Sequence, residues 1–150
     1  MASEPYRDSI HIAAQPRVVF EYFVDPRSLV RWMGDDAVLD PRPGGRFTLV
    51  IGGRTVEGRY LHVEPPRRVV ISWGRQGSRE LPPEASVLEV DLTEEDGGTR
   101  VSIVHSGLPD SESTRHALGW QHYLRRLQVA AAGGEPGLHV VPPSLTEGAD

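Results

Sequence analysis

Cysteine and lysine are both absent from this chain of 150 residues. Without cysteine the chain cannot form disulfides, thiol nucleophiles, cysteine-ligated zinc sites or iron–sulfur clusters. All 16 basic residues are arginine, which we interpret as a compositional bias of the source. The net charge is −5 and there is no large basic block. Because nucleic-acid surfaces need clustered positive charge, we expect no nucleic acid as a partner.

Long apolar runs and the common catalytic motifs are missing as well. No run approaches the ~20 apolar residues of a membrane-spanning helix, so we predict no membrane span. Residues 1–8 are polar and carry no apolar signal segment, so a cytoplasmic protein is expected. Neither glycine-rich phosphate loop pattern occurs, and no G-x-S-x-G nucleophile motif surrounds a serine.

A metal site is not indicated either. His116 and His122 lie six residues apart in a predicted helix, which separates them by about 240° around the helix axis. They therefore cannot share a metal ion, and we predict no metal and no cofactor. Asp35 and Asp36 are adjacent and would point to opposite faces of a strand, which favours a surface turn over a catalytic carboxylate pair.

The residues that are present indicate one globular domain. Hydrophobic residues make up 38% of the chain and charged residues 25%, and this length suits a single core. We predict a domain over residues 1–134 and a C-terminal tail over residues 135–150. The tail has no clear period, so it is either a loose segment or adds a short strand at Leu138 to Val141.

Hydrophobic periodicity predicts the order of the elements. A strand at Ser9–Ala13 precedes a helix that begins at Pro16, and Asp25-Pro26 starts a second short helix whose apolar face includes Trp32 and Met33. A meander of five or six antiparallel strands follows, with a hairpin at Gly52-Gly53. The strand segments are Val38-Leu39, Arg46–Ile51, Thr55–Val63, Val69–Trp73, Ser86–Leu92 and Thr99–His105.

A long amphipathic helix completes the pattern. Ser111 or Ser113 is expected to cap it, and Gly133-Gly134 ends it. Its apolar stripe consists of Ala117, Trp120, Leu124, Leu127 and Ala131. Because the apolar face of a curved sheet needs a cover, and this helix is the only large candidate, we predict an α+β fold with the sheet wrapped around the helix.

Seven short motifs in register resemble the activator of heat-shock protein 90 ATPase-like family, over about residues 7 to 132. This family belongs to the START-like (SRPBCC, polyketide cyclase, Bet v1-like) superfamily, whose helix-grip fold matches the predicted order of elements. The motifs are Ile12-Ala13-Ala14-Gln15-Pro16 with Val19-Phe20; Trp32 after Asp25-Pro26; Asp40-Pro41-Arg42-Pro43-Gly44-Gly45-Arg46-Phe47; Gly58 with Val63-Glu64-Pro65-Pro66-Arg67-Arg68; Ser72-Trp73; Gly98-Thr99-Arg100-Val101 with His105-Ser106-Gly107-Leu108; and Gly119-Trp120 with Leu124 and Leu127.

The resemblance implies a cavity between the inner face of the sheet and the C-terminal helix. Members of the superfamily bind lipids, polyketides and other apolar ligands there, so an apolar small-molecule ligand is the expected partner of a monomer or homodimer. Large aromatic side chains with a few polar groups suit such a site. The residues that we expect to line it are Trp32, Phe47, Leu49, Tyr60, Ile71, Trp73, Leu88, Val90, Ile103, His105, Trp120, Tyr123 and Leu124.

Two alternatives to simple binding remain open. Some aromatic polyketide cyclases of the superfamily use the cavity for catalysis, and here His105 with Tyr60 or Tyr123 would supply the acid–base groups. His105 could equally be a structural histidine bonded to its neighbours. The second alternative is a protein-interaction module related to the co-chaperones that name the family, although we expect no counterpart of their other domain in these 150 residues.

Overall fold

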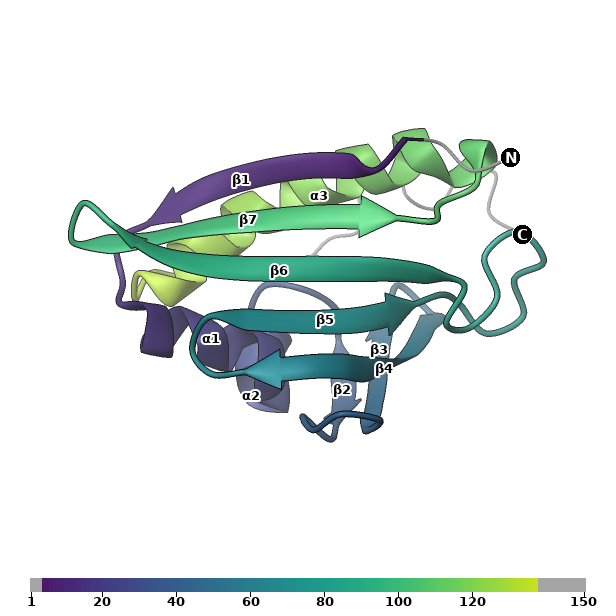
Figure 1. Ribbon diagram of the computed structural model, residues 1–150, viewed down its shortest axis with the longest axis horizontal. Coiled ribbons are helices and arrows are strands. Elements are labelled where there is room, and N and C mark those ends of the chain that lie inside the picture. Colours follow the sequence, from purple (N-terminus) through teal and green to yellow (C-terminus); the bar gives the residue numbers. More distant parts are fainter. Residues whose placement is uncertain (1–3, 138–150) are drawn as a thin grey trace.

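The computed structural model describes residues 4–137 and contains one seven-stranded sheet and three helices (Figure 1). All neighbouring strands are antiparallel, in the order β1-β7-β6-β5-β4-β3-β2. The strands are β1 (Tyr6–Ile12), β2 (Asp36–Leu39), β3 (Arg46–Ile51), β4 (Arg54–Glu64), β5 (Arg68–Trp73), β6 (Ser86–Glu95) and β7 (Gly98–Ser106).

The predicted meander of five or six antiparallel strands is confirmed with six. β2 to β7 form a meander of six, and β1 pairs along its whole length with β7 to make the seventh strand. Alternation of apolar residues identifies a strand but says nothing about its partner. The pairing of the first strand with the last brings together segments about 90 residues apart in sequence and places β1 at an edge of the sheet (Figure 1).

Two short helices connect β1 to β2. α1 (Pro16–Val24) has proline at its first position, as predicted, and its apolar residues Val19, Phe20 and Phe23 are buried. α2 (Pro26–Leu29) begins after Asp25, whose side chain caps it by accepting a hydrogen bond from the Ser28 amide at 3.1 Å. This second helix is shorter than predicted, because Trp32 and Met33 lie in the turn that follows it. Both are nevertheless buried in the core.

The long helix α3 (Asp110–Ala131) begins earlier than predicted, and neither serine caps it. Pro109 occupies the cap position and makes no side-chain hydrogen bond there. Ser113 lies inside the first turn, where its hydroxyl donates to the Asp110 carbonyl oxygen at 3.1 Å. Proline, whose φ is fixed near the value of extended and helical backbone, is well suited to lead into a helix without a capping side chain.

The helices pack on one side of the sheet and enclose a single hydrophobic core (Figure 1). One face of α3 is buried, and its residues there include Trp120, Leu124 and Leu127. Residues from all three helices and from every long strand contribute to the core. The predicted arrangement, a curved antiparallel sheet gripping a C-terminal helix, is thus confirmed.

Close backbone contact explains one glycine of the sheet. Gly58 in β4 lies against the Ser72 carbonyl oxygen of β5, and a Cβ added to it would be only 1.7 Å from that oxygen. The register between β4 and β5 shifts two residues later, between Tyr60 and His62. A side chain at position 58 would therefore force the two strands apart at the place where the sheet changes register.

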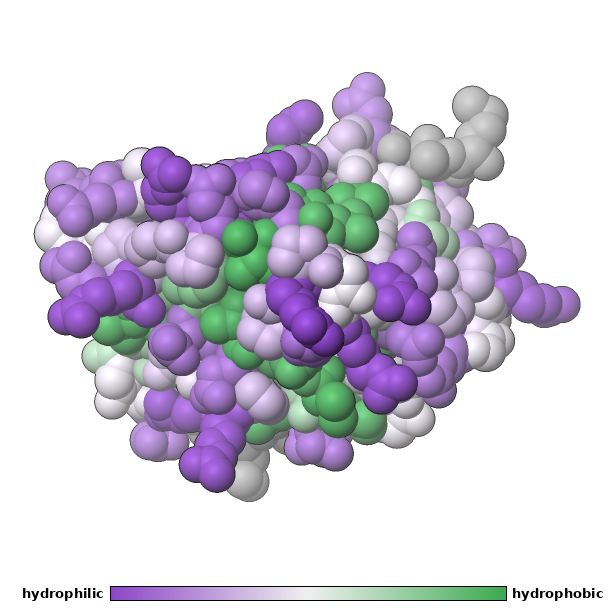
Figure 2. Space-filling view, turned by 60° about the horizontal axis from the view of Figure 1, so that its bottom comes forward, coloured by the Kyte–Doolittle hydropathy of each residue, from purple (hydrophilic) through white to green (hydrophobic). Residues whose placement is uncertain are grey.

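The outer surface is mostly hydrophilic, with hydrophobic residues exposed in an irregular band on one face (Figure 2). The most exposed large hydrophobic residues come from different elements, among them Val38 of β2, Leu61 of β4 and Leu118 of α3. Among the described residues, no helix is long and apolar enough to cross a membrane. The segment Leu138 to Val141, where a short added strand was considered, lies outside the described residues.

Candidate functional site

All thirteen residues predicted to line a cavity are buried, and all of them face the interior between sheet and helices. The parity assigned to Phe47, Leu49 and Tyr60 is therefore correct, since none is more than slightly exposed. Burial alone does not separate a residue that lines a pocket from one that fills the core. The location of the pocket makes that distinction.

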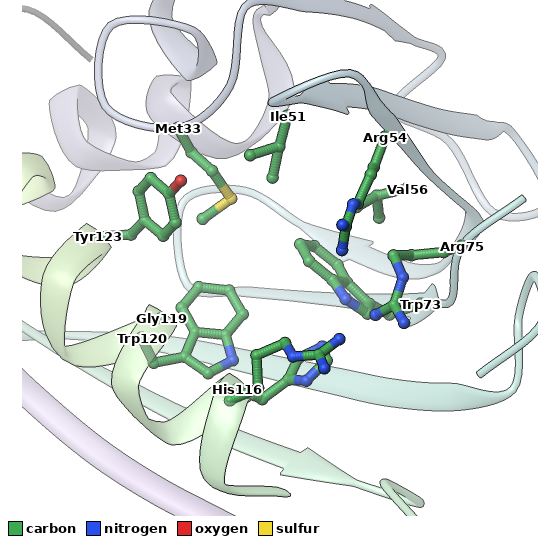
Figure 3. Close-up of a pocket in the computed structure, with 11 residues that line it drawn as sticks. Met33, Ile51, Arg54, Val56, Trp73, Arg75, His116, Gly119, Trp120 and Tyr123 are labelled. Atoms are coloured by element: carbon green, nitrogen blue, oxygen red, sulfur yellow. The ribbon is translucent and has the colours of Figure 1, made fainter. Parts of the chain in front are cut away.

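A partly enclosed pocket of about 100 Å³ lies between β3, β4 and β5 on one side and α3 on the other (Figure 3). Only Trp73, Trp120 and Tyr123 of the thirteen predicted residues line it. The other ten pack in the core away from the pocket wall: Trp32, Phe47, Leu49, Tyr60, Ile71, Leu88, Val90, Ile103, His105 and Leu124.

Eight further residues line the pocket and were not foreseen: Met33, Ile51, Arg54, Val56, Arg75, Arg115, His116 and Gly119. Ile51, Arg54 and Arg75 lie at the ends of strands or just beyond them, whereas Arg115, His116 and Gly119 belong to α3. Arg75, for example, follows β5 and forms a bridge with Val56 of β4. Ile51 continues the inward alternation of Phe47 and Leu49 in β3, and Val56 shares the inward parity of Tyr60 in β4, so strand periodicity was a signal for these two residues. A second signal was the position of His116 and Gly119 one turn before Trp120 and Tyr123 on the same helix.

A continuous aromatic wall supports the pocket. The rings of Trp73 and Trp120 lie 5.6 Å apart between centroids, and the Trp73 ring lies 5.7 Å from that of Phe47. Phe47 in turn meets Tyr60 edge to face at 5.7 Å. Such contacts hold large rings in fixed positions. The contacts with Phe47 therefore hold the Trp73 ring in place, and Tyr60 continues this packing into the core.

His105 has a hydrogen-bond partner at both ring nitrogens and is completely buried. The Trp120 indole N–H donates to Nδ1 at 3.0 Å, so Nδ1 must be an acceptor and Nε2 carries the proton. Nε2 then donates to the Ser86 hydroxyl at 2.8 Å, and that hydroxyl donates to the Trp73 carbonyl oxygen at 2.7 Å. Burial, together with the nearby His116, holds the pKa of His105 well below its usual range.

Of the two tyrosines considered as acid–base partners of His105, only one reaches the pocket. The Tyr60 hydroxyl donates to the Phe23 carbonyl oxygen at 2.8 Å inside the core and does not reach the pocket. Tyr123 does line the pocket. Burial raises the pKa of Tyr123 to about 12, so the phenol stays protonated at neutral pH. The trio of His105, Tyr60 and Tyr123 is thus not assembled around one space.

A buried ion-pair cluster closes one end of the pocket. Arg75 donates two hydrogen bonds to Glu112, at 2.9 and 3.0 Å, in a bidentate pair. The side chains are only 9% and 3% exposed. Arg115, one turn further along α3, also donates to Glu112, at 3.4 Å, and His116 Nδ1 lies 3.4 Å from the same carboxylate. The cluster ties the segment after β5 to the first turn of α3.

The charged groups of this cluster shift the pKa values of Glu112 and His116. Burial raises the pKa of Glu112, but the hydrogen bonds and charge of Arg75, with Arg115 and His116, outweigh it, so that the pKa lies below its usual range. Burial lowers the pKa of His116, and the two arginines lower it further, against the opposing effect of Glu112. At neutral pH the cluster therefore holds a carboxylate, two guanidinium groups and a neutral imidazole.

The remaining sequence candidates lie apart from this pocket. Asp36 begins β2, and the Asp35 carboxylate accepts a hydrogen bond from the Gly52 amide at 3.2 Å at the neighbouring hairpin. Within residues 4–137, no three histidine, aspartate or glutamate side chains are grouped as metal ligands would be.

The curved sheet, the gripped helix and the pocket between them define a helix-grip protein. Residues 13–132 match the family described as Activator of Hsp90 ATPase homolog 1-like protein, and the chain belongs to that family. The resemblance drawn from the seven sequence motifs is therefore confirmed.

Two individual proteins are similar to this chain in sequence. An AHSA1-like protein from Rhizobium etli is 41% identical, with a TM-score of 0.72 over 92% of this chain and 91% of that protein. The human activator of 90 kDa heat shock protein ATPase homolog 1 is 26% identical over 110 residues, which are 72% of this chain. The chain spans only 31% of the length of that human relative.

A third similarity concerns the fold alone. The Aha1 dimer from Colwellia psychrerythraea is 18% identical, with a TM-score of 0.76 over 89% of this chain and 99% of that protein. That protein forms a homodimer in solution. For the present chain, a monomer or a homodimer remains a prediction.

Proposed function

We propose that this protein binds an apolar or aromatic small molecule in the pocket between β3–β5 and α3. The observation that carries the proposal is the composition of the pocket wall, where Trp73, Trp120, Tyr123 and Met33 surround an unfilled space (Figure 3). A concave site lined by aromatic and apolar side chains with a few polar groups is typical of small-molecule sites. Family membership supports the same location, since the helix-grip fold places a cavity between sheet and helix.

The size of the pocket limits what it can hold. A volume of about 100 Å³ is well below the ~300–1,000 Å³ of sites for drug-sized ligands. An apolar cavity of about 150 Å³ is enough for benzene. The pocket is smaller than that, so it would hold a short chain or part of one ring, and the rest of a ligand would extend through its open side.

Native mass spectrometry of the protein purified from its own host tests the proposal, and a pocket-filling variant makes the test specific. Ile51 points into the pocket (Figure 3), so Ile51→Phe should fill it and reduce the amount of retained apolar compound at least tenfold. The loss of contact area with the ligand is the reason. Extraction with a mild organic solvent would identify the compound.

Val38→Phe is the matched control, because Val38 is 54% exposed on β2 and does not line the pocket. This variant should retain the compound as the wild type does. Equal amounts of retained compound in Ile51→Phe and in the wild type would contradict the binding proposal. A wild-type protein that retains no compound would contradict it as well.

An enzyme that uses the same pocket, of the polyketide cyclase or aromatase type, is the first alternative. His105 would then be an unsuitable acid or base, because both of its nitrogens are engaged and it does not reach the pocket. Tyr123 and His116 are the groups that would be available for proton transfer. Absence of turnover of polyketide-like substrates by the wild type would count against this alternative. Turnover that survives in the double variant Tyr123→Phe/His116→Asn would show that these two groups are not its acid and base.

Activation of a chaperone is the second alternative, and similarity to the human activator favours it. This chain covers less than a third of that relative, so the activity of the longer protein does not extend to it automatically. The rate of ATP hydrolysis by the Hsp90-family chaperone of the same host, measured with and without this protein, decides the matter. A stimulation that Ile51→Phe leaves intact would favour a surface interaction over the pocket.

A further inference from the structure

His116 brings a polar ring to the wall of a mainly apolar pocket. It lies on α3 one turn before Trp120, and both residues line the pocket (Figure 3). Its side chain is only 11% exposed. Met33, Ile51 and Val56 belong to the same lining and offer apolar surface. A polar atom beside such a space costs free energy unless it has a partner, so the partners of the two ring nitrogens decide what His116 offers a ligand.

Nδ1 of His116 is engaged by the preceding turn of α3. It lies 3.0 Å from the Glu112 carbonyl oxygen and 3.4 Å from the Glu112 carboxylate. Both groups only accept hydrogen bonds, so Nδ1 must carry a proton. Burial lowers the pKa of His116, and the charges of Arg75 and Arg115 lower it further, against the opposing effect of Glu112. At neutral pH the ring therefore carries its single proton at Nδ1, and Nε2 can only accept a hydrogen bond.

Nε2 of His116 is the nitrogen that remains for a ligand. Within residues 4–137, no group forms a hydrogen bond or an ion pair with it. The ring of His105 meets His116 edge to face at 5.2 Å, but both nitrogens of His105 are already bonded to Trp120 and Ser86. Nε2 of His116 is also not one of the polar atoms that the described part of the chain encloses completely. Because His116 lines the pocket, its lone pair is accessible from there.

We propose that the ligand of this pocket carries a hydroxyl group on its apolar body, as in a phenol or a short-chain alcohol, and that this hydroxyl donates a hydrogen bond to Nε2 of His116. The inference rests on the proposed binding function and narrows its ligand class. The apolar body would contact the rings of Trp73 and Trp120. A ketone or a carboxylate has no proton to donate and would set a second acceptor against the Nε2 lone pair.

Calorimetric titration with phenol and fluorobenzene tests this assignment, because the two molecules are similar in size and only phenol can donate a hydrogen bond. A purely apolar pocket would favour fluorobenzene, since the phenol hydroxyl loses its hydration on binding. We instead expect phenol to bind at least about threefold more tightly, which is within the range of one net hydrogen bond. His116→Asn keeps an amide donor for the Glu112 carbonyl oxygen but removes the acceptor at Nε2, so it should abolish the preference for phenol.

His122→Asn is the matched control, because it makes the same substitution on the same helix at a residue that lines the outer groove of α3 instead of the pocket. It should leave both affinities unchanged. Equal binding of the two probes by the wild type, or a preference for phenol that His116→Asn retains, would overturn the hydroxyl assignment while leaving the binding proposal intact. A loss of the preference in His122→Asn as large as in His116→Asn would overturn it as well. Binding of neither probe at millimolar concentration would overturn both proposals.

Nitrogen NMR of the isotope-labelled imidazole rings reads the site directly and does not depend on the stability of a variant. The signals of His116, identified by their absence from the spectrum of His116→Asn, should show a protonated Nδ1 and an unprotonated Nε2 at neutral pH. Phenol should shift the Nε2 resonance, whereas fluorobenzene should leave it unchanged. A proton on Nε2, or an Nε2 resonance that bound phenol does not move, would contradict the assignment of this nitrogen as the acceptor.

Discussion

Replacement of Glu112 by leucine should lower the free energy of unfolding by about 3–5 kcal/mol at neutral pH. The bidentate pair between Glu112 and Arg75 is almost fully shielded from water. Removal of the carboxylate leaves the Arg75 cation buried without the negative charge that offsets its lost hydration. Arg115 and His116 also face this carboxylate, so three side chains lose their shared acceptor. Urea denaturation followed by circular dichroism measures the change.

Two comparisons separate this effect from the loss of an ordinary surface charge. Glu89→Gln removes one carboxylate from the half-exposed pair with Arg68 and should cost less than about 1 kcal/mol. The double variant Arg75→Met/Glu112→Leu removes both members of the bidentate pair and should be more stable than Glu112→Leu alone, since the Arg75 cation is no longer buried without that carboxylate. If Glu112→Leu is no worse than Glu89→Gln, the cluster does not hold α3 to the end of β5 as described.

The sequence predicted the fold well because its signals are local or cumulative. The clean alternation of Leu88, Val90 and Leu92 placed β6, and the helical spacing from Trp120 to Leu127 placed the buried face of α3. The pairing of β1 with β7 depends on a partner distant in sequence, so alternation did not predict it. The start of α3 was wrong for a local reason, because Pro109 takes the cap position expected for Ser111 or Ser113.

The candidate site was harder to predict for a related reason. Residues that fill a core and residues that line a pocket share burial, hydrophobicity and strand parity, so Ile103 and Trp73 look alike in sequence. The pocket lies where the sheet is left incompletely covered by α3, near the ends of β3 and β5. Three of its lining residues, Arg54, Arg75 and Arg115, come from three separate segments and form no motif. Only the folded arrangement brings them together.

The pH dependence of stability tests whether His105 is a structural residue of the core. Its Nδ1 accepts from the Trp120 indole, which has no lone pair to receive a proton in exchange. Protonation of His105 in the folded state would therefore set two donors against each other, beside the neighbouring ring of His116 at 5.2 Å. Burial lowers the pKa of both histidines in the folded protein, whereas the unfolded chain titrates near 6.5.

The sign of the effect follows from the number of protons that each state binds. Below pH ~6.5 the unfolded chain binds protons at these positions and the folded chain does not, so stability that is present above this pH is lost as the pH falls. Each histidine contributes a slope of about 1.4 kcal/mol per pH unit until its folded pKa is reached. We expect urea unfolding to require clearly less denaturant at about pH 5.5 than at about pH 7.5.

Two variants assign that slope to the buried network. His105→Asn should be less stable than wild type at about pH 7.5, because it breaks the chain of hydrogen bonds from Trp120 to Ser86, but its stability should decline less steeply toward acid. Ser86→Ala should also be less stable, yet it keeps both histidines and should retain the wild-type slope. A wild-type stability that is flat across this range would show that the folded protein accepts the protons freely. The buried network around His105 would then not resist protonation as its hydrogen bonds indicate.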